Sequence, residues 1–161
     1  NMNVVILFIY GEGGHKAQMK SLLKKMELKK NKLKFIGVCE NSSVINSLDE
    51  NYTFPPLRDK YSNFKTFIKL PVSFLSYIKI LYFLHKKYEV KAVISTGPGI
   101  AIIASMFFKL FRKKTIFLET YSRFETQSLT GRVMYKVADR FYIQNKSLQK
   151  YYPNSIYSGL L

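Results

Sequence analysis

Residues 4–19 constrain the fold of this chain more than any other stretch. Residues 4–10 form an apolar, β-branched run, which predicts a buried strand followed by a helix. Between them, Gly11, Gly13 and Gly14 predict a tight turn, because glycine reaches positive φ and lets a ligand approach the backbone. A helix that begins after such a turn directs free N–H groups and the positive end of its dipole beyond the sheet. The stretch therefore predicts a site for an anion such as phosphate.

The spacing of the turn, G-x-G-G-H, differs from that of two common nucleotide-binding motifs. It is neither the G-x-G-x-x-G of dinucleotide-binding folds nor a P-loop, and Glu40 is the only candidate for the acidic residue that a dinucleotide enzyme needs after its second strand. His15 follows the glycines at the first turn of the helix, where a ligand would lie. Two alternatives remain open: a strand–turn–helix joint without a ligand, and a histidine that only contacts a neighbouring loop.

The rest of the chain repeats the alternation of strand and helix. The chain has 161 residues, of which 47% are hydrophobic, so it is long enough for one domain with a sizeable core. We expect this domain to span residues 2–161, without Asn1. Such alternation predicts an α/β fold with a single Rossmann-like, doubly wound parallel sheet. The predicted strands are 4–10, 34–38, 52–54, 92–95, 114–119 and 140–144, and the predicted helices are 15–28, 64–87, 100–111 and one that begins at Gln127 or Ser128.

Three loops are expected to meet at one edge of this sheet. In parallel α/β sheets, ligands bind beyond the carboxyl ends of the strands. Residues 11–15, 96–99 and 119–123 all follow predicted strands and so lie at that edge. Their convergence predicts one composite binding site.

The net charge of +16 predicts an anionic partner, which is a membrane surface, a nucleic acid or a phosphorylated substrate. A basic nucleic-acid-binding α/β module is one alternative, but the lysines are spread along helices and no nucleic-acid-binding motif is present, so no nucleic acid is expected. Cys39 is the single cysteine, which excludes a disulfide framework, and with only His15 and His85 as histidines we expect neither a metal nor a cofactor.

Residues 64–84 are helical in pattern, apolar and aromatic, yet they carry several lysines. Their uncharged runs are shorter than the roughly 20 residues that span a bilayer. In one interpretation the helix faces the core and its lysines extend outward. In the other, it lies in a membrane interface with its lysines on anionic lipid. The candidate membrane contacts are Phe64, Lys65, Phe67, Lys69, Phe74 and Lys79.

The motifs together resemble a known family. The opening strand-G-x-G-G-H-helix is similar to the start of the acceptor domain in GT-B glycosyltransferases. The chain resembles the acceptor-side subunits of split UDP-sugar transferases still more closely, and this resemblance covers essentially the whole chain. The matching motifs are residues 95–99 (Ser-Thr-Gly-Pro-Gly), residues 118–120 (Leu-Glu-Thr), Arg123 and residues 128–132 (Ser-Leu-Thr-Gly-Arg).

The resemblance implies a fold equivalent to the N-terminal, acceptor half of a GT-B enzyme. It implies that a separate chain binds the UDP-sugar, and that this chain binds a lipid-pyrophosphate-linked sugar and is inactive alone. Bacterial members serve capsule and exopolysaccharide synthesis. Because no N-terminal transmembrane anchor is visible, we expect peripheral attachment to the cytoplasmic face of the membrane. A self-sufficient small glycosyltransferase is the alternative within the family.

The resemblance also implies residue roles. His15 is the candidate general base for the acceptor hydroxyl, and Glu119 is either a rival base or the residue that orients a neighbouring loop. Arg123 is a candidate for phosphate binding, and its alternative role is an ion pair with a neighbouring carboxylate. Ser128 is a candidate for the same site, and its alternative role is to cap the next helix. The apolar tail is the candidate partner contact through Tyr157, Leu160 and Leu161. The candidate pyrophosphate-binding residues are Gly11, Gly13, Gly14, Lys16, Gly97, Gly99, Arg123 and Ser128.

Overall fold

The computed structural model describes residues 2–56, 63–97, 99–123 and 126–161, with the side chains of 63–70 outside the description. Seven strands form one sheet, and every neighbouring pair is parallel. The order is β3-β2-β1-β4-β5-β6-β7, so the chain starts in the middle and winds out to both edges. The strands are β1 (Val4–Ile9), β2 (Lys34–Glu40), β3 (Glu50–Phe54), β4 (Glu89–Thr96), β5 (Lys114–Leu118), β6 (Arg140–Ile143) and β7 (Ile156–Tyr157).

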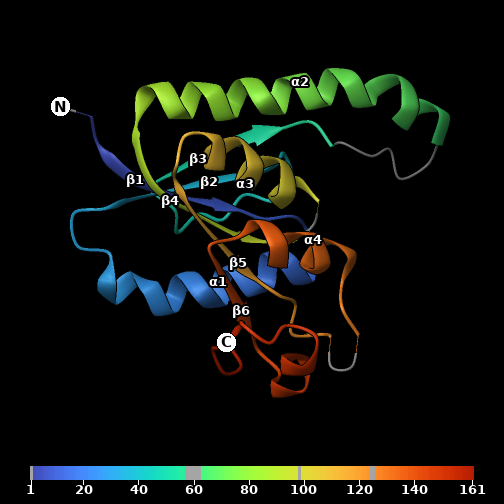
Figure 1. Ribbon diagram of the computed structural model, residues 1–161. Coiled ribbons are helices and arrows are strands. Elements are labelled where there is room, and N and C mark those ends of the chain that lie inside the picture. Colours follow the sequence, from blue (N-terminus) through green and yellow to red (C-terminus); the bar gives the residue numbers. More distant parts are fainter. Residues whose placement is uncertain (1, 57–62, 98, 124–125) are drawn as a thin grey trace.

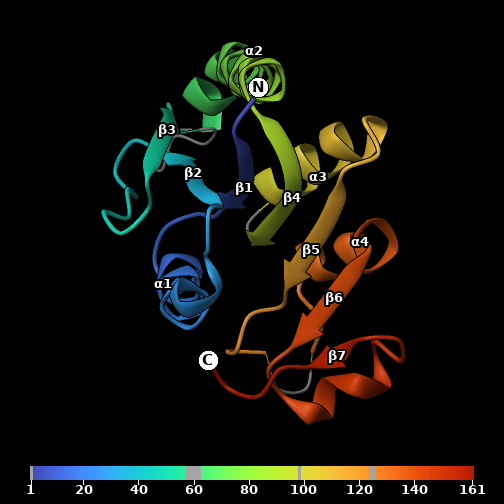
Figure 2. The same cartoon turned by 90° about the vertical axis from the view of Figure 1, so that its left-hand side faces the viewer.

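Helices cover both faces of the sheet. Figure 2 shows α1 on one face and α2, α3 and α4 on the other, and Figure 1 shows the long α2 along the outside of this second layer. The helices are α1 (Gly14–Met26), α2 (Asn63–Lys87), α3 (Ile100–Leu110) and α4 (Leu129–Val137), with the short 3-10 helices η1 (Glu27–Lys29) and η2 (Lys146–Lys150). The predicted α/β, doubly wound parallel sheet is confirmed.

The central strand β1 explains why two layers form. Its side chains alternate between the faces, as in any strand. Leu7 and Ile9 pack against the layer of α2 and α3, whereas Ile6 and Phe8 pack against α1. A strand that is apolar on both faces is stable only between two helical layers, which is why its sequence reads as a continuous apolar run.

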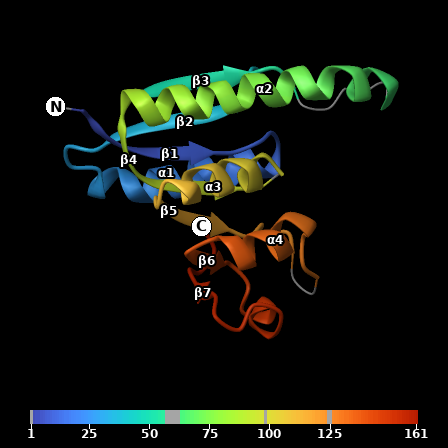
Figure 3. The same ribbon diagram turned by 45° about the horizontal axis from the view of Figure 1, so that its top comes forward.

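The structure assigns α2 a buried face and an exposed apolar face. Tyr77, Leu81 and Leu84 are fully buried against the sheet, so the C-terminal part of α2 faces the core. The opposite face leaves Val72 at 67% and Leu75 at 57% exposure, and Figure 3 shows α2 lying along the outside of β2 and β3. The core therefore accounts for only one side of this helix.

The candidate membrane contacts divide between described and undescribed side chains. Phe74 is 42% exposed and Lys79 is exposed. The side chains of Phe64, Lys65, Phe67 and Lys69 lie outside the described residues. Across the described ranges, no helix has both the length and the apolar composition that crossing a bilayer requires.

Candidate functional site

In the glycine turn after β1, the predicted positive φ occurs at Gly13 but not at Gly11 or Gly14. Gly13 has φ 65°, in the left-handed region that favours glycine, and it is the N-cap of α1. Its carbonyl accepts from the Ala17 amide at 3.0 Å. Among the residues that the structure describes, no side chain caps this helix, so the N–H groups of its first turn are open to a ligand.

A cavity of about 400 Å³ lies at the carboxyl ends of the strands. It is formed by the start of α1, the loop after β4, the loop after β5 and the start of α4. Two helix N-termini therefore face one space, which favours an anionic ligand. We call this space the rim pocket; its lining residues are Gly14, His15, Gly97, Phe117, Glu119, Thr120, Ser122, Arg123, Ser128, Leu129 and Thr130.

The rim pocket brings together residues from all three predicted loops. Both candidate bases, His15 and Glu119, line it. So do four of the candidate pyrophosphate-binding residues, namely Gly14, Gly97, Arg123 and Ser128. The other four do not: Gly11 is buried before the turn, Gly13 and Gly99 are the N-caps of α1 and α3, and the half-buried Lys16 is not among the lining residues.

His15 packs closely against the loop after β4. A Cβ atom on Gly97 would lie 2.7 Å from His15 Cε1, so only glycine fits there without displacing the imidazole. His15 Nδ1 is buried and has no hydrogen-bond partner within the described ranges. Burial lowers the pKa of His15 below its usual value, while the negative charge of Glu119 acts in the opposite direction. The lowered pKa favours the neutral ring, the form in which an imidazole can accept a proton.

Glu119 is almost completely buried, with 1% exposure, and its carboxylate is fully engaged. It accepts from Ser128 Oγ at 2.7 and 2.9 Å, from Tyr152 Oη at 2.7 Å and from the Thr120 amide at 3.0 Å. A carboxylate held by three groups is poorly placed to take a proton from a substrate. The geometry therefore favours the role of orienting the loop over that of a base.

Ser128 connects Glu119 to the start of α4. Its hydroxyl donates to Glu119 and accepts from the Gly131 amide at 2.8 Å, so the predicted helix cap is confirmed. A Cβ on Gly131 would lie 1.9 Å from Glu119 Oε2, so this glycine lets the helix approach the carboxylate. Arg123 donates to Thr126 Oγ1 at 3.1 Å and lies at the rim pocket.

Three buried polar residues that support the site were not predicted. Tyr152 binds the carboxylate of Glu119, while Gln18 and Gln144 donate to its carbonyl oxygen at 3.2 and 3.1 Å. The partner of Gln18 lies 101 residues away in the chain. No local pattern could indicate these contacts, because a lone glutamine or tyrosine in an apolar segment also fits an exposed position.

The C-terminal tail is hydrogen-bonded to one of these supporting residues, Gln144. The Leu161 amide donates to Gln144 Oε1 at 3.2 Å, and Lys25 Nζ donates to the Leu160 carbonyl at 3.5 Å. Leu161 lines an apolar cavity of about 270 Å³ between α1 and the β4–β6 face, whereas Leu160 is 68% and Tyr157 45% exposed. The tail thus lies on the sheet and leaves the side chains of Leu160 and Tyr157 exposed.

Solved structures with a similar fold belong to larger enzymes. MurG from Acinetobacter baumannii matches with a TM-score of 0.61 at 14% identity, over 88% of this chain and 41% of that one. UDP-N-acetylglucosamine 2-epimerase from Rickettsia bellii matches with a TM-score of 0.65 at 13% identity, over 99% of this chain and 45% of that one. The fold is therefore that of one half of GT-B-like enzymes.

Comparison with known sequences identifies the family of this chain, whereas the structural comparison identifies only its fold. The protein called UDP-N-acetylglucosamine transferase subunit ALG14 in Kluyveromyces lactis is 26% identical over 99% of this chain and 79% of its own length. The protein of the same name in Yarrowia lipolytica is 22% identical over 99% of this chain and 82% of its own length. The family model for "Oligosaccharide biosynthesis protein Alg14 like" matches residues 5–161. The chain, with its glycine turn and rim pocket, therefore belongs to the Alg14-like family.

Proposed function

We propose that this chain is the acceptor-binding and membrane-recruiting subunit of a two-component UDP-sugar glycosyltransferase. The relatives are named as subunits of a UDP-N-acetylglucosamine transferase, which supports N-acetylglucosamine as the transferred sugar. The single observation that carries the proposal is the rim pocket, where two helix N-termini and the His15 imidazole meet at the carboxyl edge of the sheet.

The acceptor is a sugar linked to a lipid through pyrophosphate. Its pyrophosphate lies against the amides at the starts of α1 and α4, with Arg123 adding a charge-assisted contact. Gly14 leaves room for close approach, since a Cβ atom there would meet nothing within 4 Å, whereas the space beside Gly97 is taken by the His15 imidazole. Six of the ten candidate catalytic and pyrophosphate-binding residues line this pocket, which supports the assignment.

The reaction is a displacement at the anomeric carbon of the UDP-sugar. The acceptor hydroxyl forms the new C–O bond, the bond from the anomeric carbon to the UDP oxygen breaks, and the proton of the hydroxyl goes to His15. His15 is suited to this because burial lowers its pKa and favours the neutral ring. Glu119 acts as a positioning residue, since its contacts hold Ser128 and the loop that carries Arg123.

The second chain supplies the UDP-sugar site, and the complex forms in part through the tail with Tyr157, Leu160 and Leu161. Exposed Leu160 and the apolar cavity lined by Leu161 support this contact. The exposed apolar face of α2, together with the net charge of +16, supports peripheral binding to the anionic, cytoplasmic face of a membrane. A role in capsule or exopolysaccharide synthesis belongs to the same proposal.

The proposal is tested by sugar transfer to a lipid-pyrophosphate acceptor in membranes. Radiolabelled UDP-N-acetylglucosamine is supplied to this chain alone, to its partner alone and to both together. Product formed only with both chains supports the two-component enzyme. Full activity from this chain alone would instead establish a self-sufficient transferase, and binding to DNA without preference for anionic vesicles would favour the nucleic-acid module.

A further inference from the structure

Two buried glutamines, Gln18 of α1 and Gln144 directly after β6, bind the same backbone atom of Glu119. Gln18 Nε2 donates to the Glu119 carbonyl oxygen at 3.2 Å, and Gln144 Nε2 donates to it at 3.1 Å. Both glutamines are almost completely buried, with 2% and 3% exposure. Burial of an amide is unfavourable unless the amide is hydrogen-bonded, so both side chains hold the Glu119 backbone in one position.

The two glutamines differ in what their amide oxygens meet. Gln144 Oε1 accepts from the Leu161 amide at 3.2 Å. Gln18 Oε1 is buried and has no hydrogen-bond partner within the described ranges. Of the two, Gln144 alone therefore connects Glu119 to the C-terminal tail.

The bond from Leu161 to Gln144 is the main polar link between the tail and the interior of the protein. Gly159 has φ 75°, in the left-handed region, and Figure 2 shows the segment after β7 returning toward α1. There Lys25 Nζ donates to the Leu160 carbonyl, but at 3.5 Å this contact is long and exposed. A partner chain that holds the tail therefore also holds the acceptor side of the Gln144 amide.

Glu119 connects the two glutamines to the rim pocket. Its carboxylate accepts from the hydroxyl of Ser128, the N-cap of α4, at 2.7 and 2.9 Å. It also accepts from the Thr120 amide at 3.0 Å, in the loop after β5. Glu119, Thr120 and Ser128 all line the rim pocket. A displacement of the Glu119 backbone would therefore move the helix start and the loop at which we place the pyrophosphate.

We propose that Gln144 couples the binding of the partner chain at the tail to the binding of the acceptor pyrophosphate in the rim pocket. The inference rests on the proposed function for its two ligands and adds the link between them. With the tail held by the partner, the Leu161 amide fixes Gln144, and Gln144 fixes Glu119 with the start of α4. Gln144 is a positioning residue, since it does not itself line the rim pocket.

This coupling has a functional consequence. The chain would bind its acceptor most tightly when it is assembled with the partner that brings the UDP-sugar. Because coupling between two binding sites is reciprocal, pyrophosphate must tighten partner binding by the same factor by which the partner tightens pyrophosphate binding.

Isothermal titration calorimetry measures the coupling. The partner chain is titrated into the full chain with and without saturating inorganic pyrophosphate, at constant ionic strength. In the wild type, pyrophosphate should tighten partner binding about fivefold or more, which is the lower end of typical coupling between two sites. If both ligands bind but their affinities are independent, or if pyrophosphate weakens partner binding, the coupling is wrong and the proposed function still stands.

Gln144→Met and Gln18→Met are a matched pair of variants. Each removes one donor from the same carbonyl and replaces a buried amide by a side chain of similar size. Gln144→Met also breaks the link to the tail. We expect pyrophosphate to lose its effect on partner affinity in Gln144→Met and to keep it in Gln18→Met. An effect of the anion's charge would be the same in both variants, so equal coupling in the two would overturn the proposal.

Leu161→Pro tests the same link without altering the interior. Proline has no amide hydrogen, so the bond to Gln144 is lost while an apolar side chain remains at the cavity. The control is Leu161→Val, which keeps the amide and has a side chain of similar size. Coupling should be lost in the proline variant and kept in the valine variant. Coupling that persists in Leu161→Pro would overturn the proposal even where Gln144→Met fails to fold.

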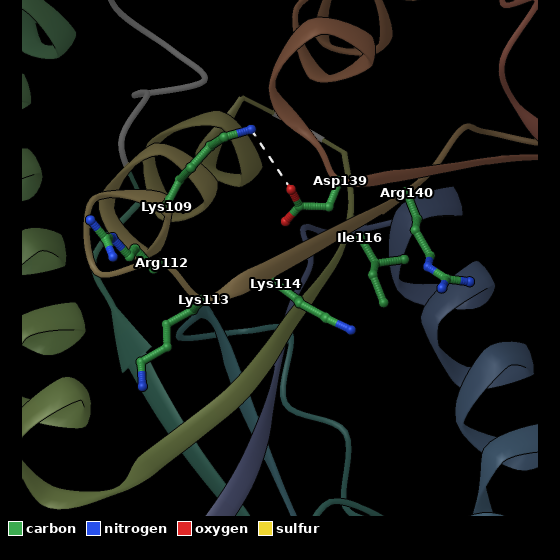
Figure 4. Close-up of a pocket in the computed structure, with 7 residues that line it drawn as sticks. All are labelled: Lys109, Arg112, Lys113, Lys114, Ile116, Asp139 and Arg140. Atoms are coloured by element: carbon green, nitrogen blue, oxygen red, sulfur yellow. Dashed lines mark ion pairs between the residues drawn. The ribbon is translucent and has the colours of Figure 1, made fainter.

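Two-dimensional NMR of the backbone amides shows where pyrophosphate binds. A second cavity, of about 530 Å³, lies at the amino ends of β5 and β6, on the sheet edge opposite the rim pocket. It is lined by cations, but Figure 4 shows Arg112 and Lys113 pointing away from Lys114 and Arg140, so these side chains do not surround one anion. We expect pyrophosphate to shift the amides at the starts of α1 and α4. Absence of these shifts would overturn the proposed function, and this inference with it.

Discussion

At the scale of single residues, His15 is the side chain on which the proposed chemistry depends. His15→Asn keeps a polar side chain of similar size but cannot take up a proton. We expect the transfer rate of the reconstituted two-chain enzyme to fall about 10²–10⁴-fold, the usual contribution of a general base. Thermal unfolding followed by circular dichroism should stay unchanged. Retained activity would move the base to the partner chain or to Glu119.

The pH dependence of transfer gives a second measure of the same residue. Burial lowers the pKa of His15, so its neutral form persists to a lower pH than that of an exposed imidazole, which titrates near about 6.5. Activity should therefore be constant at neutral pH and fall only as the pH drops through the lowered pKa. A rate that already falls between pH 8 and 7 would contradict this assignment.

A variant of Glu119 distinguishes a positioning role of this residue from a catalytic one. Glu119→Gln keeps the shape but weakens the bonds from Ser128 and Tyr152, which are now directed at a neutral amide. We expect a stability loss of about 1–3 kcal/mol, typical of a disturbed buried polar group, and an increase in KM for the acceptor that exceeds the decrease in kcat. A large decrease in kcat with unchanged KM and stability would instead assign Glu119 as the base.

At the scale of secondary-structure elements, Glu50 ties β3 to β2 and to the end of α2. It forms an ion pair with Lys34 and accepts from Tyr88 at 2.6 Å and from Tyr52 at 3.1 Å. Lys34 first, and then Tyr88, lowers the pKa of Glu50 to about 2. Because the folded pKa lies below the unfolded one, this stabilisation is present above about pH 4.3 and is lost as the pH falls toward 2.

Replacing Glu50 should remove that component of acid sensitivity. Glu50→Gln should lower the free energy of unfolding at pH 7 and reduce its slope between pH 4.5 and 2, as measured by urea unfolding at a series of pH values. Glu89→Gln, at an exposed position of β4, is the control and should keep the wild-type slope. An unchanged slope in Glu50→Gln would show that the contacts of Glu50 do not stabilise the fold.

The outer face of α2 is the second test at this scale. Val72→Ser with Leu75→Ser should reduce cosedimentation with anionic vesicles, since both side chains are exposed and their apolar area would enter the interface. Stability should change by less than about 0.5 kcal/mol, as is usual for surface positions. Leu28→Ser, at a 93% exposed position of η1, is the control and should bind as the wild type does. Wild-type binding by the α2 variant would leave this face without a role at the membrane.

At the scale of the whole molecule, hydrogen bonds connect the tail, which we propose as the partner contact, to the buried residues that support the rim pocket. Leu161 bonds to Gln144, and Gln144 bonds to the Glu119 carbonyl. Deleting residues 159–161 should weaken association with the partner chain about tenfold or more, equivalent to about 1.4 kcal/mol, measured by isothermal titration calorimetry. Ser122→Ala, in the rim pocket, should leave this affinity unchanged. An equal affinity for the shortened chain would remove the tail from the interface.

The fold was largely predictable because its signals are local. The apolar run at residues 4–10, the glycine turn and the regular alternation of strand and helix each depend on neighbours in sequence. Strand β7 was not predicted, because two residues are too few to show an alternating pattern. Helix α2 was predicted as a helix, but which of its faces is buried depends on the sheet beneath it.

For the site, the sequence determined which loops meet and the tertiary structure decided what each side chain does there. The carboxyl ends of parallel strands share one edge, so the convergence of the loops that carry His15, Gly97 and Glu119 followed from the alternation of strands and helices alone. The engagement of Glu119 by Tyr152 and the burial of His15 depend on contacts between segments distant in the chain. Burial and hydrogen-bond partners are properties of packed atoms in three dimensions, and a pattern of neighbouring residues does not contain them.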